Sequence, residues 1–264
     1  MGGAFTIVAT SAKSDFISKF TLVHPVIRLL VIMCTNLFSM YFFFLLASYV
    51  GNPDVSPEYV IIGNVVQSVS TSTLYSATNI SGTEKHTGTL EPILSSPSRL
   101  FFIFFGKSLF SISMGFVSVS VSLFYAAFIF GVDFSSANIG AIVLICVLTC
   151  LSLAGMGLAI GSIGIYLRTS AILANLFGYI GLLICGVNFP VSYLPGWLQT
   201  FSYGMPLTYA VEATRSAVGG SALTMMAEPL LVMTLLGAIY LTAAWFIFGF
   251  FEKISRNRGS LDSF

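Results

Sequence analysis

The sequence predicts an all-α polytopic membrane protein with six transmembrane helices. Of its 264 residues, 56% are hydrophobic and only 8% are charged, whereas a soluble domain carries about 25% charged residues. The mean hydropathy is +0.94, so the chain has too few charges to keep its surface in water. A net charge of +1 also excludes the strongly basic surface that nucleic-acid binding requires.

Six runs of mainly apolar residues are long enough, or nearly so, to cross a hydrocarbon layer, which takes about 20 helical residues. The second run is the least apolar because Ser, Thr, Asn and Gln interrupt it, and the fifth is also compatible with a pair of spans. The six runs lie at residues 26–50, 59–80, 100–130, 139–166, 171–189 and 229–251.

The positive residues alternate with these runs and predict the orientation of the chain. Ten of the eleven Lys and Arg residues fall in or beside connections of one side, whereas Arg215 and five acids, Asp54, Glu58, Asp133, Glu212 and Glu228, fall on the other. The positive-inside rule therefore places both termini in the cytoplasm and the protein in the cell membrane. The ten are Lys13, Lys19, Arg28, Lys85, Arg99, Lys107, Arg168, Lys253, Arg256 and Arg258.

The segments outside the runs have their own predictions. Residues 1–25 combine aromatic and basic residues as in a helix at the cytoplasmic interface, with a flexible tail as the alternative. Residues 82–98 are polar and punctuated by glycine and proline, with a short helix near 87–94. Residues 191–221 are rich in proline and aromatic residues and predict an outer re-entrant hairpin with helices near 196–202 and 207–218. Residues 252–264 form a cytoplasmic tail.

Polar residues inside the second run are the first candidates for function. Asn64, Gln67 and Thr71 recur at helical spacing, so they face one direction. Two interpretations remain open, a polar wall of a substrate path or hydrogen-bonding contacts between packed helices. In the fourth run, Gly157 and Gly161 form a small-xxx-small pair that predicts close packing of two helices.

The chain lacks the residues that would let it harvest energy or catalyse a reaction. Gly106-Lys107-Ser108 is similar to the end of a phosphate-binding loop, but Phe101 stands where the first glycine is required. We therefore expect Lys107 to extend its side chain toward the cytoplasmic interface. The spans contain no carboxylate pair, no nucleophile with a base, and few ionisable groups for an ion relay. The chain is not expected to be an enzyme by itself or to bind a metal or cofactor.

Two segments carry motifs, one before the third span and one before the last. The second motif is residues 205–210, MPLTYA, with Glu212 and Arg215. The first consists of Glu84, Lys85, Thr87, Gly88, Thr89, Leu90, Glu91, Ile93, Leu94, Ser96, Pro97 and Ser98. Both resemble the type 2 family of ATP-binding-cassette exporter permeases, the ABC-2 family, in which an acidic–basic pair precedes Gly-Thr-Leu-Glu, two apolar residues and a proline.

The resemblance implies a permease subunit in a dimer, formed with a second copy or a paralogue and docked on separate ABC ATPase subunits that bind ATP and Mg. Residues 26–251 would form the transmembrane domain. The residues expected to couple to the ATPase are Glu84, Lys85, Thr87, Gly88, Leu90, Glu91, Ile93, Leu94 and Pro97. Among them, Glu84, Lys85 and Glu91 would pair with ATPase charges, and Leu90, Ile93 and Leu94 would fill an apolar groove.

The same resemblance implies where a substrate moves. The second and fifth helices of the family flank the path, which predicts Asn64, Gln67, Thr71 and Asn175 as path residues. The outer motif would comprise Pro206, Tyr209, Glu212 and Arg215. The expected cargo is an amphipathic or hydrophobic drug, lipid or glycan conjugate. A function from another class, an ATP-independent channel or a scaffold protein, remains the alternative.

Overall fold

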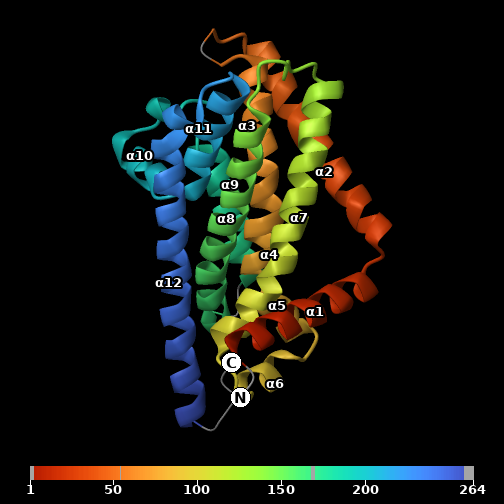
Figure 1. Cartoon of the computed structure of the whole chain (residues 1–264), viewed down its shortest axis with the longest axis vertical. Coiled ribbons are helices and arrows are strands. Elements are labelled where there is room, and N and C mark those ends of the chain that lie inside the picture. Colours follow the sequence, from red (N-terminus) through yellow and green to blue (C-terminus); the bar gives the residue numbers. More distant parts are fainter. Residues whose placement is uncertain (1–2, 54, 168–169, 259–264) are drawn as a thin grey trace.

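The computed structural model describes residues 3–53, 55–167 and 170–258, and all regular structure in this part of the chain is helical (Figure 1). Asp54 and Arg168, used above for orientation, lie outside the described residues. The elements are α1 (Ala4–Leu22), α2 (Pro25–Val50), α3 (Pro57–Val69), the π-helical turn η1 (Ser70–Leu74), α4 (Tyr75–Thr78), α5 (Ile80–His86), α6 (Leu90–Leu94), α7 (Leu100–Phe128), α8 (Ile139–Leu167), α9 (Ser170–Ile184), η2 (Val191–Tyr193), α10 (Gly196–Tyr203), α11 (Pro206–Val218), η3 (Leu223–Met226) and α12 (Ala227–Arg258).

Four helical segments of the described chain are long and apolar enough to cross a membrane: Pro25–Val50, Leu100–Phe128, Ile139–Gly164 and Leu223–Phe250. The predicted second run is not one regular helix, because the π-helical turn η1 separates α3 from α4. The run STST fills this turn, and Thr71 Oγ1 donates to the Ser68 carbonyl at 3.0 Å. Hydroxyls that compete for backbone carbonyls favour such local distortion of a helix. The predicted fifth run is shortened to α9, which ends at Ile184.

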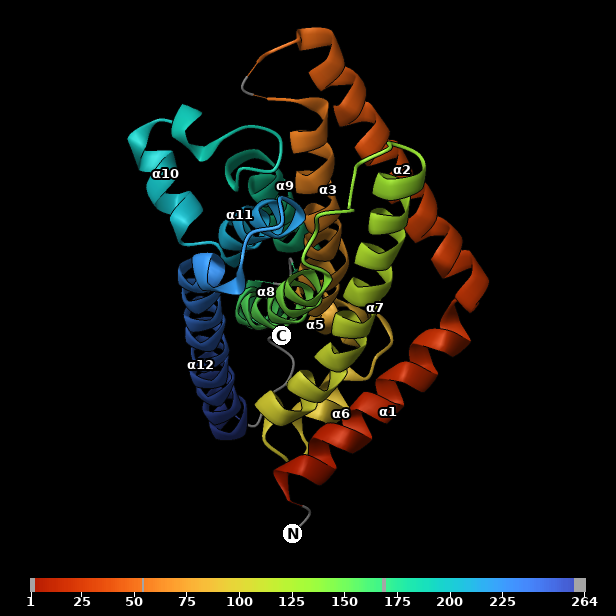
Figure 2. The ribbon, with the colours of Figure 1, turned by 45° about the horizontal axis from the view of Figure 1, so that its top comes forward.

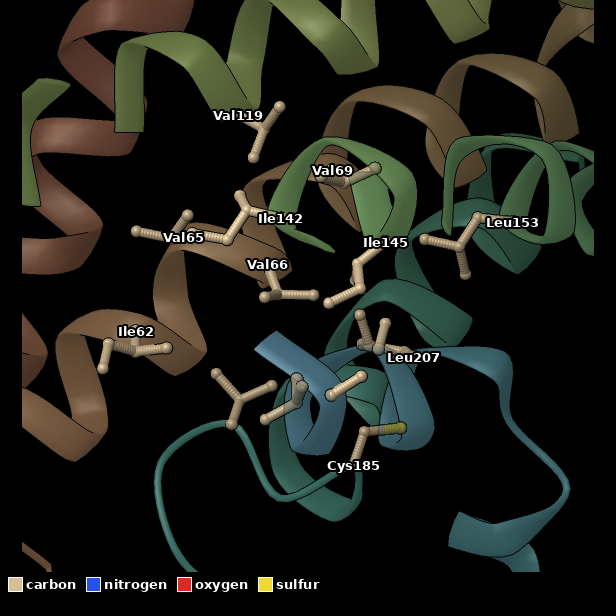
Figure 3. Packing of buried hydrophobic residues seen from close by; sticks show 14 of the residues in the cluster. Ile62, Val65, Val66, Val69, Val119, Ile142, Ile145, Leu153, Cys185 and Leu207 are labelled. Atoms are coloured by element: carbon tan, nitrogen blue, oxygen red, sulfur yellow. The ribbon is translucent and has the colours of Figure 1, made fainter. Parts of the chain in front are cut away.

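The core of the bundle is built around α3. Every residue of α3 from Val60 to Val69 is buried, because α2, α7, α8 and α11 all pack against this helix. Figure 3 shows Val65, Val66 and Val69 meeting Ile142 and Ile145 of α8. A helix surrounded in this way needs no apolar face toward lipid, which explains how it tolerates Asn64 and Gln67.

The predicted close packing at the glycine pair of α8 is confirmed, and its partner is α4. A Cβ added to Gly157 would lie 2.7 Å from Ala77 Cβ and 2.9 Å from the Leu74 carbonyl oxygen. At Gly161 the added Cβ would lie 2.7 Å from the Thr78 carbonyl oxygen. The two backbones therefore touch only because neither position carries a side chain.

Replacing Gly161 with Ala should destabilise the bundle by about 1–3 kcal/mol, because the new methyl group overlaps backbone atoms that cannot rotate away. Gly249→Ala in α12 is the matched control, since nothing lies within 4 Å of its added Cβ and alanine favours a helix. Unfolding in mixed micelles measures both variants. Equal stability of the two would contradict the close contact of α4 and α8.

Helix α1 crosses the end of the bundle that carries α5 and α6, and turns sharply into α2 (Figures 1 and 2). A Cβ added to Gly106 of α7 would lie 2.5 Å from the Val8 carbonyl oxygen, so α1 rests directly on α7. The Phe110 ring packs edge-on against Phe16 and Phe20, at centroid distances of 5.0 and 5.7 Å. The structure has a helix where the N-terminal helix was predicted, and its place at the cytoplasmic interface stays a prediction.

Candidate functional site

The first candidate site is the turn between α5 and α6, within the 82–98 segment. Gly88 adopts a φ of +71°, a left-handed conformation that favours glycine. The reversal brings Thr89 back to Glu84, where the Thr89 backbone N–H donates to the Glu84 carbonyl at 2.9 Å. The helix predicted near 87–94 is therefore shorter than expected: α6 covers Leu90–Leu94, and this turn joins it to α5, which ends at His86. The turn thus explains the Gly88-Thr89 pair of the motif: Gly88 adopts the left-handed conformation, and Thr89 binds back to Glu84.

The carboxylate of Glu84 is bound on both sides within the chain. Lys107 Nζ donates to Glu84 Oε1 at 2.7 Å, and Thr89 Oγ1 donates to Glu84 Oε2 at 2.6 Å. Glu84 is 7% exposed and Lys107 is 8% exposed. This corrects one prediction, because the buried Lys107 does not extend toward the interface. The pair instead fastens α5 to α7. Pairing of Glu84 with an ATPase charge stays a prediction.

The apolar residues of α6 are also used internally. Leu90 and Leu94 are buried in a cluster with Leu100 and Phe104 of α7, Leu158 of α8 and Phe248 of α12, and Ile93 packs against that cluster. Leu90 and Leu94 are thus buried within the chain and Ile93 is half-buried, and the expectation that the three residues fill a groove of another protein stays a prediction. These side chains anchor the segment to three long helices.

The 82–98 segment exposes a short polar face to solvent. This face contains the basic Lys85 and the acidic Glu91, the two charged residues of the motif that make no ion pair with Lys107. The exposed members of the predicted set are Lys85, Thr87, Gly88, Glu91 and Pro97.

A second ion pair, within α1, lies at the same end of the bundle. Lys19 Nζ lies 2.9 Å from Asp15 Oδ2, and both residues line a cavity of about 470 Å³ together with Glu84 and Lys107. Burial raises the pKa of the Asp15 carboxyl above its usual value, while the neighbouring Lys19 opposes that shift. The i,i+4 spacing of Asp15 and Lys19 predicts their pairing on one helix, but nothing in the sequence predicts that this pair lies near Glu84 and Lys107.

The second candidate site is a cavity of about 620 Å³ between α2, α3 and η1, which we call the α2–α3 cavity. Three of the four predicted path residues, Asn64, Gln67 and Thr71, lie in its wall. The fourth, Asn175, is exposed on α9 and does not line it. The other polar lining residues are Arg28, Thr35, Asn36, Ser39, Ser68, Ser72, Tyr75 and Ser76.

The same polar residues also join helices, so both interpretations of the second run have support. Asn64 Nδ2 donates to Asn188 Oδ1 at 2.9 Å, and Gln67 Nε2 donates to the Gly178 carbonyl at 3.3 Å. Asn36 Nδ2 donates to Ser118 Oγ at 2.9 Å. Asn36 and Ser39 of α2 were not among the predicted path residues. The sequence feature that could have predicted them is that both are polar residues within the apolar run 26–50.

The outer motif begins α11 and closes the hairpin on itself. Pro206 is the first residue of α11, where its missing N–H costs no hydrogen bond. Tyr209 Oη donates to the Tyr203 carbonyl at 3.1 Å, which ties α11 to α10. Glu212 is exposed.

Arg215 joins the outer hairpin to the start of α3. Its Nη2 donates to the carbonyls of Tyr59 at 3.1 Å and Val187 at 2.9 Å. Its guanidinium carbon lies 3.3 Å from the centroid of the Tyr59 ring, a cation–π contact. The planar guanidinium suits this double role, since one face stacks while the edge donates.

Both motifs and the α3 side of the cavity lie within one stretch of the chain. A sequence model of the family described as ABC-2 type transporter matches residues 51–218. The chain belongs to the ABC-2 type transporter family. The match begins just before α3 and ends with α11, so it contains the 82–98 segment, Asn64, Gln67, Thr71 and Arg215.

Two relatives place this ABC-2 chain among membrane permeases. Each is named probable multidrug ABC transporter permease YbhR, one from Escherichia coli strain K12 and the other from Escherichia coli O157:H7. Each is 24% identical over 165 residues, which are 62% of this chain and 45% of the relative. The ABC-2 chain thus matches less than half of the length of these relatives.

Proposed function

We propose that this chain is the membrane subunit of an ATP-driven exporter that moves an amphipathic or hydrophobic molecule with energy from a separate ABC ATPase. The observation that carries the proposal is the construction of the 82–98 segment, which bears the family motif. Its interior is fastened to α7, α8 and α12 through Glu84, Leu90 and Leu94, while Lys85 and Glu91 remain in solvent. A rigidly held, exposed, charged segment is suited to receive a force from a docked subunit.

The proposal includes six membrane crossings. In it, α3 with η1 and α4 forms the second crossing, and α9 forms the fifth beside the four long apolar helices. The start of α1 and the end of α12 lie at the end of the bundle that carries α5 and α6 (Figure 1), which suits an even number of crossings. This end would be cytoplasmic, with α10 and α11 re-entrant at the opposite end.

ATP-driven closure of two ATPase subunits would pull on α5 and α6 of each permease copy. Displacement would pass to α7 through the Glu84–Lys107 pair and to α8 and α12 through the buried leucines. Helix α5 follows α4 in the chain, and α4 in turn continues η1 and α3. A displacement of α5 would therefore also move the α3 wall of the α2–α3 cavity. In a dimer, Asn64, Gln67 and Thr71 would line the path, and Asn175 on α9 would meet the second copy.

The test is recovery of the ATPase with a tagged chain. Glu91→Lys reverses a charge on the exposed face of α6 and should reduce ATPase recovery at least tenfold, because like charges across an interface are repelled. Glu58→Lys makes the same change at an exposed site of α3, at the opposite end, and should leave recovery unchanged. Failure of the wild-type chain to recover an ABC ATPase would overturn the proposal.

A further inference from the structure

An arginine with unused hydrogen-bond donors lies at one end of the α2–α3 cavity. Arg28, in the first turn of α2, lines the cavity beside Val31 and Ile32. Its Nη2 donates to the Lys19 carbonyl at 3.1 Å, and its guanidinium carbon lies 5.1 Å from the centroid of the Phe110 ring. Its Nε is buried and has no hydrogen-bond partner.

No carboxylate in the described part of the chain lies within 4 Å of Arg28, although Asp15 attracts its charge from farther away. The ion pairs at this end of the bundle are Lys19 with Asp15 and Lys107 with Glu84. Each of these acids is thus already matched by a lysine, which leaves the guanidinium as the surplus positive charge of the cluster. A partly buried guanidinium in this condition is stabilised by an anion that completes its hydrogen bonds.

The rest of the cavity is elongated along α2. From Arg28 to Met40, both in its lining, α2 extends about 18 Å at a rise of about 1.5 Å per residue. Val31, Ile32 and Met40 supply apolar surface from α2, interspersed with the polar residues Thr35, Asn36 and Ser39, while the wall opposite is largely hydroxyl and amide. This shape suits a ligand with a charged head and a single extended chain.

We infer that the α2–α3 cavity binds anionic amphiphiles, with a phosphate or carboxylate head at Arg28 and the chain directed along α2 toward Met40. The inference rests on the proposed function, since it names the substrate class of the same cavity. A transported amphiphile and a resident membrane phospholipid share this chemistry, and the experiment separates them.

The probe is radiolabelled monododecyl phosphate added to the 264-residue chain in phosphatidylcholine nanodiscs. Saturable binding is expected, with dodecylphosphocholine at least tenfold weaker because its head carries no net charge. Arg28→Gln should weaken binding of the phosphate at least tenfold, since it removes a charge-assisted hydrogen bond. Lys13→Gln is the matched control, because Lys13 is an exposed cation of α1 outside the cavity lining.

A second variant keeps the test informative if Arg28→Gln fails to fold. Thr35→Trp leaves Arg28 in place and fills the cavity from an exposed position of α2, so it should also abolish saturable binding. Unchanged binding in both variants that fold, or equal affinity for the phosphate and the phosphocholine, would overturn the inference.

The source of the ligand is decided with the ATPase and ATP present. ATP-dependent transfer of the phosphate probe across the membrane identifies a transported amphiphile. Displacement of the probe by phosphatidylglycerol, without transfer, identifies a resident lipid; either result supports the site. Because binding is measured on the chain without the ATPase, loss of the site leaves ATPase recovery intact, and failed recovery leaves the binding measurement valid.

Discussion

Replacing Glu84 with Gln should lower the free energy of unfolding by about 3 kcal/mol and abolish ATP-driven transport. The substitution leaves the Lys107 ammonium buried without its carboxylate, and removing one partner of a buried ion pair is costly because the other remains charged. It also loosens α5 from α7, the connection through which the 82–98 segment would move the bundle. Unfolding in mixed micelles and transport in proteoliposomes measure the two effects.

Two controls separate the ion pair from the general effect of a changed charge. The double substitution Glu84→Gln with Lys107→Met removes both charges and should recover most of the lost stability, because no unpaired ion remains. Glu91→Gln removes an exposed carboxylate of the same segment and should change stability by less than about 0.5 kcal/mol. Equal losses for Glu84→Gln and Glu91→Gln would show that the pair contributes nothing.

The second large effect is expected at Arg215. Arg215→Ala should cost about 2–3 kcal/mol, since it removes a hydrogen bond to the fully buried Val187 carbonyl and the contact with the Tyr59 ring. Arg215→Lys should recover less than half, because an ammonium cannot stack and donate along the same plane. Hydrogen exchange should become faster in α10 and α11 and remain slow in α7 and α8.

Gly63 tests the same junction from the opposite side. A Cβ at this position would overlap the Val187 carbonyl and crowd the Arg215 guanidinium, so Gly63→Ala should separate the hairpin from α3 as Arg215→Ala does. Gly178→Ala in α9 is the matched control, because its added Cβ meets nothing within 4 Å. If Gly63→Ala folds with the stability of Gly178→Ala, the junction between α3 and the hairpin is misplaced.

Local signals in the sequence predicted much of the helical layout. The outer helices expected near 196–202 and 207–218 are α10, Gly196–Tyr203, and α11, Pro206–Val218. Proline at a helix start and glycine after its end mark these bounds. The same reasoning placed Asn64, Gln67 and Thr71 on one side of a helix, and all three line the α2–α3 cavity.

Features that depend on distant contacts were beyond reach of the sequence. Lys107 is 23 residues from Glu84, and only the packing of α7 beside α5 makes them partners. Leu90 and Leu94 have an apolar pattern that fits either a groove of another subunit or the protein's own core, and only the structure shows that they pack with α7, α8 and α12. The π-helical turn η1 arises where hydroxyl residues pack against α7 and α8, which composition alone does not specify.

The central claim is that the 82–98 segment receives its motion from another subunit. The most direct measurement is uphill solute movement in proteoliposomes that contain the purified chain, with and without its ABC ATPase and ATP. We expect accumulation against a gradient only with both present, and its loss in Glu84→Gln. Uphill movement by the chain alone, free of any nucleotidase, would contradict the account.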